Sequence, residues 1–115
     1  MKPKDNMHLY YIGCQSLGVV KIGRAVDPNG RLRSLLHGSP TTDLNMLFVA
    51  WDRGADEYAV HYLWRNKHHH GEWFVLDEEL RSWIESGAEL PDGFVPGKFN
   101  CRKKLMKRKA VSIFY

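Results

Sequence analysis

Two short apolar runs separated by a turn are the feature that most constrains the fold of this chain. His8–Gly13 has the sequence HLYYIG, Val19–Gly23 has the sequence VVKIG, and only CQSLG lies between them. Short runs rich in β-branched and aromatic residues, joined by a link that contains glycine, are typical of a β-hairpin. We therefore predict two neighbouring antiparallel strands at this position.

A helix is predicted directly after the hairpin. Asp27 can accept a hydrogen bond at its start, and Pro28 suits the first helical position. One face is apolar because three leucines recur at helical spacing, namely Leu32, Leu35 and Leu36. Gly38 and Pro40 end this helix. The next run, Leu44–Trp51, is apolar on both faces and predicts a central strand.

The second half of the chain predicts two more helices. One covers about Ala55 to Asn66, with Asp52 or Asp56 as its cap; the other follows Asp77 and stops at Gly87. A short extended piece, Glu72–Leu76, lies between them. The expected fold is α+β, a small three-stranded, mainly antiparallel sheet flanked by helices. We expect a domain over residues 1–90, a linker over 91–97 and a basic tail over 98–115.

Basic charge is concentrated in that tail. Residues 1–97 hold 10 Lys and Arg against 13 Asp and Glu, whereas residues 98–115 hold 7 Lys and Arg and no acidic residue. Such a run is typical of segments that neutralise phosphates without reading sequence, although a solvated tail is the alternative. The expected nucleic-acid contacts are Lys98, Arg102, Lys103, Lys104, Lys107, Arg108 and Lys109.

Five polar residues are candidates for chemistry: Tyr10, Lys21, Arg31, Glu57 and His61. Each has an ordinary explanation as well. Tyr10 is compatible with a core aromatic residue, and Arg31 and Glu57 with surface helix charges. His61 follows Glu57 by four residues, so the two side chains share a helix face. Neither a phosphate-binding loop of the Walker type nor a zinc box is present in the sequence.

The ordered motifs LYYIG, VVKIGRAVDPNGRL, EYAVH and GEWF span roughly His8 to Ile84. In this order they resemble the small phage-type branch of the GIY-YIG nuclease superfamily, first described from an open reading frame of phage T5. The resemblance implies a metal-dependent endonuclease that acts on nucleic acid, with DNA favoured over RNA. A catalytically weak or silent module, or an interaction protein that reuses the fold, is the alternative.

The resemblance also implies roles for individual residues. Tyr10 matches the tyrosine of the GIY half, and Lys21 stands where the other half usually has tyrosine. Arg31 matches the phosphate-binding helix arginine, and Glu57 matches the ligand of a single Mg²⁺ or Mn²⁺ ion. Tyr10 would act as general base with help from the Lys21 cation, or would pass its proton to His61.

Two departures from the family pattern concern the site. Leu35 stands where the family often has histidine or tyrosine, which leaves His37 or His61 as substitutes, and no late asparagine motif is identifiable. Glu72, in GEWF, is either a structural carboxylate or a residue at the edge of the site. Arg24 is compatible equally with a phosphate contact and with a surface salt bridge.

The histidine run and the two cysteines give further expectations about local structure and cellular compartment. The histidine run at residues 68–70 is interpreted as a solvated loop, with phosphate contact as the alternative. Cys14 and Cys101 lack metal-box spacing and predict free thiols in a reducing compartment. We therefore expect a cytoplasmic protein, nucleoid-associated or in a phage-infected host, with no membrane partner. The sequence does not indicate an oligomeric state.

Overall fold

The predicted hairpin is formed by β1 (His8–Cys14) and β2 (Val19–Ala25), which pair in antiparallel fashion. Gly18 closes the turn with a φ of 65°, which favours glycine, and its N–H donates to the Cys14 carbonyl at 2.9 Å. The register places Tyr10 opposite Gly23. These observations come from a computed structural model that describes residues 6–38 and 43–100.

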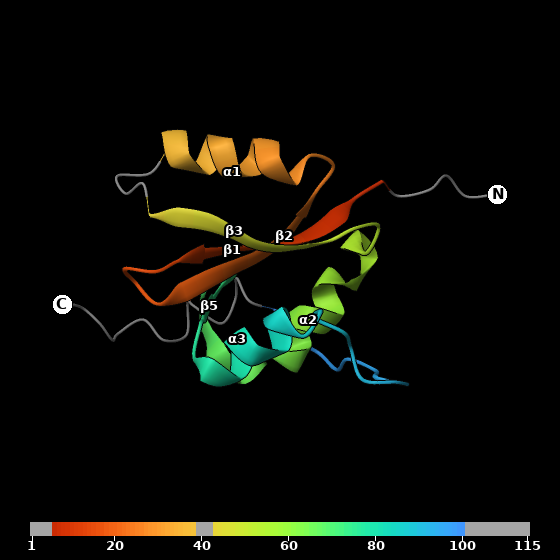
Figure 1. The fold of residues 1–115 in the computed structure, drawn as a ribbon. Coiled ribbons are helices and arrows are strands. Elements are labelled where there is room, and N and C mark those ends of the chain that lie inside the picture. The colour runs from red at the N-terminus through yellow and green to blue at the C-terminus, as the bar shows by residue number, and fades with distance from the viewer. Residues whose placement is uncertain (1–5, 39–42, 101–115) are drawn as a thin grey trace.

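The sheet has five strands in the order β3-β1-β2-β5-β4, and every pairing is antiparallel. Helix α1 covers one face, and α2 and α3 lie on the other (Figure 1). The predicted α+β class is confirmed, although the sheet has two more strands than the predicted three. The remaining bounds are β3 (Leu44–Ala50), β4 (His68–His70), β5 (Trp73–Val75), α1 (Pro28–His37), α2 (Glu57–Leu63) and α3 (Glu78–Glu85).

Strand β3 is an edge strand, so the prediction that it is central was wrong. Strand β1 is flanked by β2 and β3, and all its residues from Leu9 to Cys14 are buried. Most of β3 is only half-buried, and Asn45 is exposed. Its apolar residues contribute to the packed clusters on both faces of the sheet, because Leu47 and Phe48 pack on one side and Met46 on the other.

The histidine run forms strand β4, so the prediction of a loop was also wrong. A turn at Gly71, whose φ is 55°, brings β4 back against β5. His68 is buried, whereas His69 and His70 are exposed. Three identical polar residues have no periodicity that predicts a strand, so pairing with β5 determines this conformation.

The helix ends follow local chemistry. The Asp27 carboxylate accepts from Gly30 N–H at 3.1 Å at the start of α1, and the Asp77 carboxylate accepts from Leu80 N–H at 3.0 Å at the start of α3. The second predicted helix is shorter than expected. It is divided into α2 and two flanking 3₁₀ turns, Gly54–Asp56 and Arg65–Lys67, and Asp56 makes no side-chain cap.

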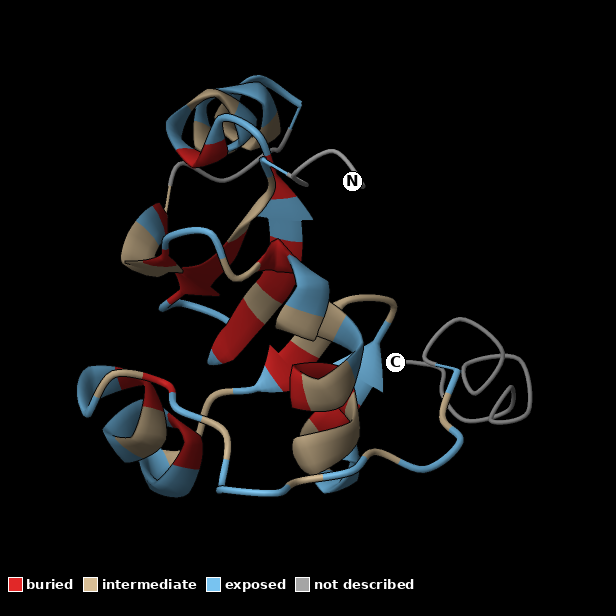
Figure 2. Ribbon diagram, turned by 90° about the vertical axis from the view of Figure 1, so that its right-hand side faces the viewer, coloured by how far each residue is buried: buried red, intermediate tan, exposed pale blue. Residues whose placement is uncertain are grey.

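Two apolar clusters cover the two faces of the sheet, because side chains alternate along a strand. Tyr11, Ile22 and Phe74 pack toward α2 and α3, while Tyr10 and Ile12 pack toward α1. Figure 2 shows this buried centre running through the strands. Within the described part of the chain, no helix is long and apolar enough to cross a membrane.

Candidate active site

The site brings together side chains from four distant parts of the chain. Tyr10 comes from β1, Lys21 from β2 and Arg31 from the first turns of α1, while Glu57 is the first residue of α2. The charges of Arg31 and Glu57 both act on the Tyr10 hydroxyl. Tyr10, Arg31 and Glu57, which the sequence places far apart, therefore lie within electrostatic reach of one another.

Tyr10 is fully buried, and its hydroxyl oxygen has no hydrogen-bond partner among the described residues. Burial raises the pKa of Tyr10 to about 12, and the charges of Glu72 and Glu57 act in the same direction. The Arg31 guanidinium opposes this rise. Tyr10 is therefore a neutral phenol near neutral pH, and it needs an acceptor for its proton if it is to accept one from water.

Lys21 pairs with Glu72. Its Nζ lies 3.1 Å from Glu72 Oε1 and 5.6 Å from the centroid of the Trp73 ring. The sequence predicts Lys21 beside Tyr10, but the register pairs Lys21 with Ile12. The lysine cation thus neutralises a carboxylate that neighbours Tyr10.

Glu57 lies in a crowded electrostatic environment. Its Oε1 is 3.5 Å from Arg24 Nε, and its Oε2 is 4.0 Å from His61 Nε2. Burial raises the pKa of Glu57 to about 7, and the charge of Glu72 and a hydrogen bond between the two carboxyl groups add to the rise. Arg24 opposes it. A cation at this carboxyl group would offset the cost of its ionisation.

Glu72 is the residue of the site that the sequence did not assign. It lies directly before β5, whose residue Trp73 pairs with Lys21. Its carboxyl group contacts Lys21 and lies beside Glu57. The GEWF motif was the sequence feature from which Glu72 could have been identified as a site residue. Its meaning depends on the β2–β5 register, which the sequence does not reveal.

His61 is held at the end of the pairing between β2 and β5. Its Nε2 donates to the Ile22 carbonyl at 2.8 Å, just beyond the last pair of that ladder, and its ring lies against Phe74 on the α2 face. Tyr10 packs in the cluster on the opposite face. The structure therefore places His61 beside Glu57, and its hydrogen bond to Ile22 joins α2 to β2.

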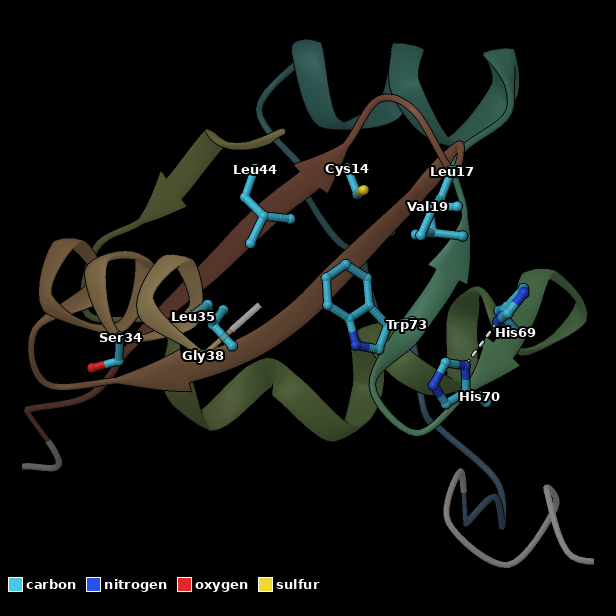
Figure 3. Close-up of a pocket in the computed structure, with 10 residues that line it drawn as sticks. All are labelled: Cys14, Leu17, Val19, Ser34, Leu35, Gly38, Leu44, His69, His70 and Trp73. Atoms are coloured by element: carbon cyan, nitrogen blue, oxygen red, sulfur yellow. Dashed lines mark hydrogen bonds between the residues drawn. The ribbon is translucent and has the colours of Figure 1, made fainter. Parts of the chain in front are cut away.

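An apolar cavity of about 400 Å³ lies next to the site, between α1 and the sheet. Leu35 forms part of its wall, so the α1 position where the family often carries a polar ring is here apolar. Figure 3 shows Leu35 and Trp73 on either side of this space, with His69 and His70 beyond Trp73. Its lining residues are Cys14, Leu17, Val19, Ser34, Leu35, Gly38, Leu44, His69, His70 and Trp73. His37 ends α1 and is exposed.

The remaining predictions fall partly outside the described residues. Arg24 forms the ion pair with Glu57, and Lys98 is exposed. Cys14 is a buried free thiol. Cys101 and the predicted phosphate contacts Arg102, Lys103, Lys104, Lys107, Arg108 and Lys109 lie outside the described residues.

The donor groups at the site suit a hard divalent cation. Among the described residues, no group of three or more His, Cys, Asp or Glu side chains forms a cage for a metal. Mg²⁺ does not need one, because it is commonly held by one or two carboxylates, with water and phosphate oxygens completing its shell. Glu57, with Glu72 beside it, provides such a carboxylate.

A family model of the T5orf172 domain matches residues 7–86, which is more than half of the 115 residues. This is a phage-type, nuclease-like domain family that interacts with nucleic acid, in agreement with the branch indicated by the motifs. The matched range includes Tyr10, Lys21, Arg31, Glu57 and Glu72. Comparisons with curated proteins and with solved structures gave no significant match.

Proposed function

The chain belongs to the T5orf172 domain family, and from that premise we propose that it is a metal-dependent endonuclease that hydrolyses phosphodiesters in DNA. The observation that supports this most strongly is the environment of the Tyr10 hydroxyl group. A fully buried phenol without a hydrogen-bond partner among the described residues lies within the electrostatic reach of one guanidinium and two carboxyl groups. Burying a hydroxyl group without a hydrogen-bond partner lowers the stability of the fold, and such groups are typical of active sites.

Each group has a task in this reaction. The Arg31 guanidinium binds two phosphate oxygens and stabilises the charge that develops on them. The Tyr10 hydroxyl orients the attacking water and exchanges a proton with it. The Glu57 carboxylate would hold one Mg²⁺ or Mn²⁺ ion, which when bound supplies Lewis-acid stabilisation of the phosphate. Lys21 keeps the carboxyl group of Glu72 in position, because the two form an ion pair at 3.1 Å.

The exposed cations around the site bind the substrate backbone. Arg31 and Arg24 both have exposed side chains on the surface that surrounds Tyr10. The basic residues after Asn100 add sequence-independent affinity for phosphates. Because these contacts read the backbone alone, we expect cleavage with little sequence preference.

Incubation with supercoiled plasmid tests the proposed function. Wild-type protein should nick or linearise the plasmid with Mg²⁺ or Mn²⁺, and chelation should stop the reaction. Glu57→Gln should lower the rate by about 10²-fold or more. Glu85→Gln, which changes an exposed carboxyl group on α3, is the matched control and should cut as wild type does. A wild-type protein that binds the plasmid but never cuts it would identify a binding module instead.

A further inference from the structure

We propose that the exposed Trp51 ring stacks on an unpaired base of the nucleic-acid strand that the site binds. The proposal rests on the proposed function and deepens it, because it names a substrate class: strands with an unpaired nucleotide beside the bound phosphate. Three observations support it, namely the exposure of Trp51, the contacts that fix its backbone, and its place on the same face of the sheet as Tyr10.

Trp51 is the most exposed of the four tryptophans in the chain. It is 59% exposed, whereas Trp64 is buried and Trp73 and Trp83 are partly buried. An indole ring that stays in water forgoes the stabilisation that its burial in the core would give. Its flat surface is therefore open to the ring of a ligand.

The backbone around Trp51 is fixed by hydrogen bonds. The chain turns directly after β3, where Arg53 N–H donates to the Ala50 carbonyl at 3.3 Å. Asp52 has a φ of 62°, which is uncommon for a residue other than glycine, and its N–H donates to His8 Nδ1 at 2.8 Å. The His8 ring also contacts the Trp51 ring, with centroids 4.7 Å apart and planes at 67°. Because Trp51 is held in place before a ligand binds, the entropic cost of stacking is low.

The Trp51 ring lies on the same face of the sheet as Tyr10. Side chains alternate along a strand, so His8, which contacts Trp51, projects from the same side of β1 as Tyr10. Ala25 pairs with His8 and packs in the same cluster as Tyr10. Strand β1 starts and β3 ends at the end of the sheet where α1, which carries Arg31, begins (Figure 1). Two residues of a strand span about 7 Å, about the rise of two stacked nucleotides, so a phosphate at the site and a base at Trp51 would belong to neighbouring nucleotides.

The charges near Trp51 favour a base over other ligands at this point. The Asp52 carboxylate is 71% exposed, so it repels phosphate, whereas the exposed Arg31 and Arg24 side chains are the proposed contacts of the strand's backbone. One ring beside an exposed carboxylate is a smaller apolar surface than a stable protein interface needs. A base offers a flat aromatic face, and stacking tolerates any of the four bases, in keeping with the weak sequence preference expected above.

The substrate class follows from the geometry of stacking. In a duplex both faces of a base are covered by its neighbours, so a base must leave the stack before it reaches Trp51. The energy required is least where the base is already single-stranded. We therefore expect the protein to prefer overhangs, flaps and gaps to continuous duplex.

Binding of two fluorescein-labelled strands to the full-length protein in EDTA, followed by fluorescence anisotropy, tests the stacking role. One strand is oligodeoxythymidylate, and the other has the same backbone with abasic sites in place of the bases. Wild type should bind the first about tenfold more tightly, and Trp51→Ala should lose most of this preference although its stability to urea is unchanged. Trp51→Phe should keep most of the preference, and Val95→Ala, which changes an exposed apolar residue after α3, should keep all of it. The same preference in wild type and Trp51→Ala would overturn the proposal.

Cleavage with Mg²⁺ tells failure of the proposed function apart from failure of this inference. Wild type should cut a duplex with a single-stranded overhang faster than the blunt duplex of the same sequence. Trp51→Ala should narrow this difference, mainly through KM, because stacking holds substrate and transition state alike. A protein that shows the expected binding preferences but cuts neither duplex would overturn the proposed function and leave the stacking role intact. Cleavage that responds neither to the overhang nor to the Trp51 substitution would overturn the substrate class.

Discussion

At the scale of single residues, Glu57 makes stability depend on pH. Its pKa is about 7 in the fold against 4.5 in the unfolded chain, mainly because it is buried. Between these values the folded protein keeps a proton that the unfolded chain has released. The contribution of Glu57 to the free energy of unfolding should therefore be fully present below pH 4.5 and should be lost as the pH rises to about 7.

Urea unfolding of metal-free protein at several pH values checks this prediction. Glu57→Gln removes the titrating group, so the stability of wild type relative to this variant should decrease by about 2 kcal/mol between pH 4.5 and 7. Added Mg²⁺ should restore part of that loss in wild type at pH 7.5. A stability difference that is the same at every pH would show that Glu57 does not carry this raised pKa.

Gly23 should tolerate no side chain. A Cβ there would lie 2.5 Å from the Tyr10 hydroxyl oxygen and 2.7 Å from Tyr10 Cζ, so the ring must move. Gly23→Ala should lower the free energy of unfolding by about 1–3 kcal/mol and should reduce cleavage. In a Tyr10→Phe background the hydroxyl is absent, and the same substitution should destabilise less. Equal losses in both backgrounds would contradict this contact.

The ordered motifs predicted Tyr10, Arg31 and Glu57, and the structure brings these three together. They could be predicted because each lies in a short motif that fixes both residue type and order. Glu72 could not be assigned in the same way. Its importance depends on Trp73 lying opposite Lys21, and such pairing is a tertiary property that three residues of β5 do not encode.

At the scale of elements, the hairpin, α1 and α3 were predictable because their signals are local. Alternation, Asp caps and Pro28 act within a few residues of the elements that they start. The position of β3 was not predictable in this way. Apolar residues on both faces indicated a central strand, but they are equally required by an edge strand that contributes to two packed clusters. Strand β4 exists only through its pairing with β5.

The segment after α3, which the sequence predicts as a linker over residues 91–97, contacts the domain. The Tyr58 hydroxyl on α2 donates to the Gly97 carbonyl and accepts from Phe99 N–H at 2.9 Å. The Phe94 ring lies 6.1 Å from that of Tyr62, and the Phe99 ring 5.4 Å from that of His68. Residues 94–99 therefore pack along α2 and β4.

Tyr58→Phe should release this segment. The variant loses two hydrogen bonds to the backbone, so we expect faster amide hydrogen exchange at Phe99 and a loss of about 1–2 kcal/mol of stability. Tyr62→Phe, which keeps the aromatic contact to Phe94, serves as the control and should leave exchange at Phe99 unchanged. Identical exchange in wild type and Tyr58→Phe would show that the hydrogen bonds do not hold the segment.

At the scale of the whole molecule, the proposed site and the densest run of basic residues lie in different parts of the chain. The proposed site belongs to the part that matches the family, whereas six of the 17 Lys and Arg residues follow Asn100. Because Phe99 packs on the domain, a protein ending at Asn100 should keep its fold. It should bind DNA more weakly, and its log–log salt slope should be shallower by about 0.9 for each phosphate that the tail neutralises. Unchanged affinity and slope would contradict a role for the tail.

The central claim, that the α1 face of the sheet carries the chemistry, is tested most directly with Tyr10 and Tyr11. Both are fully buried with hydroxyl groups that have no partner among the described residues, and they point to opposite faces of the sheet. Removing either hydroxyl should leave the protein as stable as wild type or about 1 kcal/mol more stable. In a single-turnover plasmid assay with Mg²⁺, Tyr10→Phe should abolish cleavage and Tyr11→Phe should retain it. Equal rates for the two variants would contradict the claim.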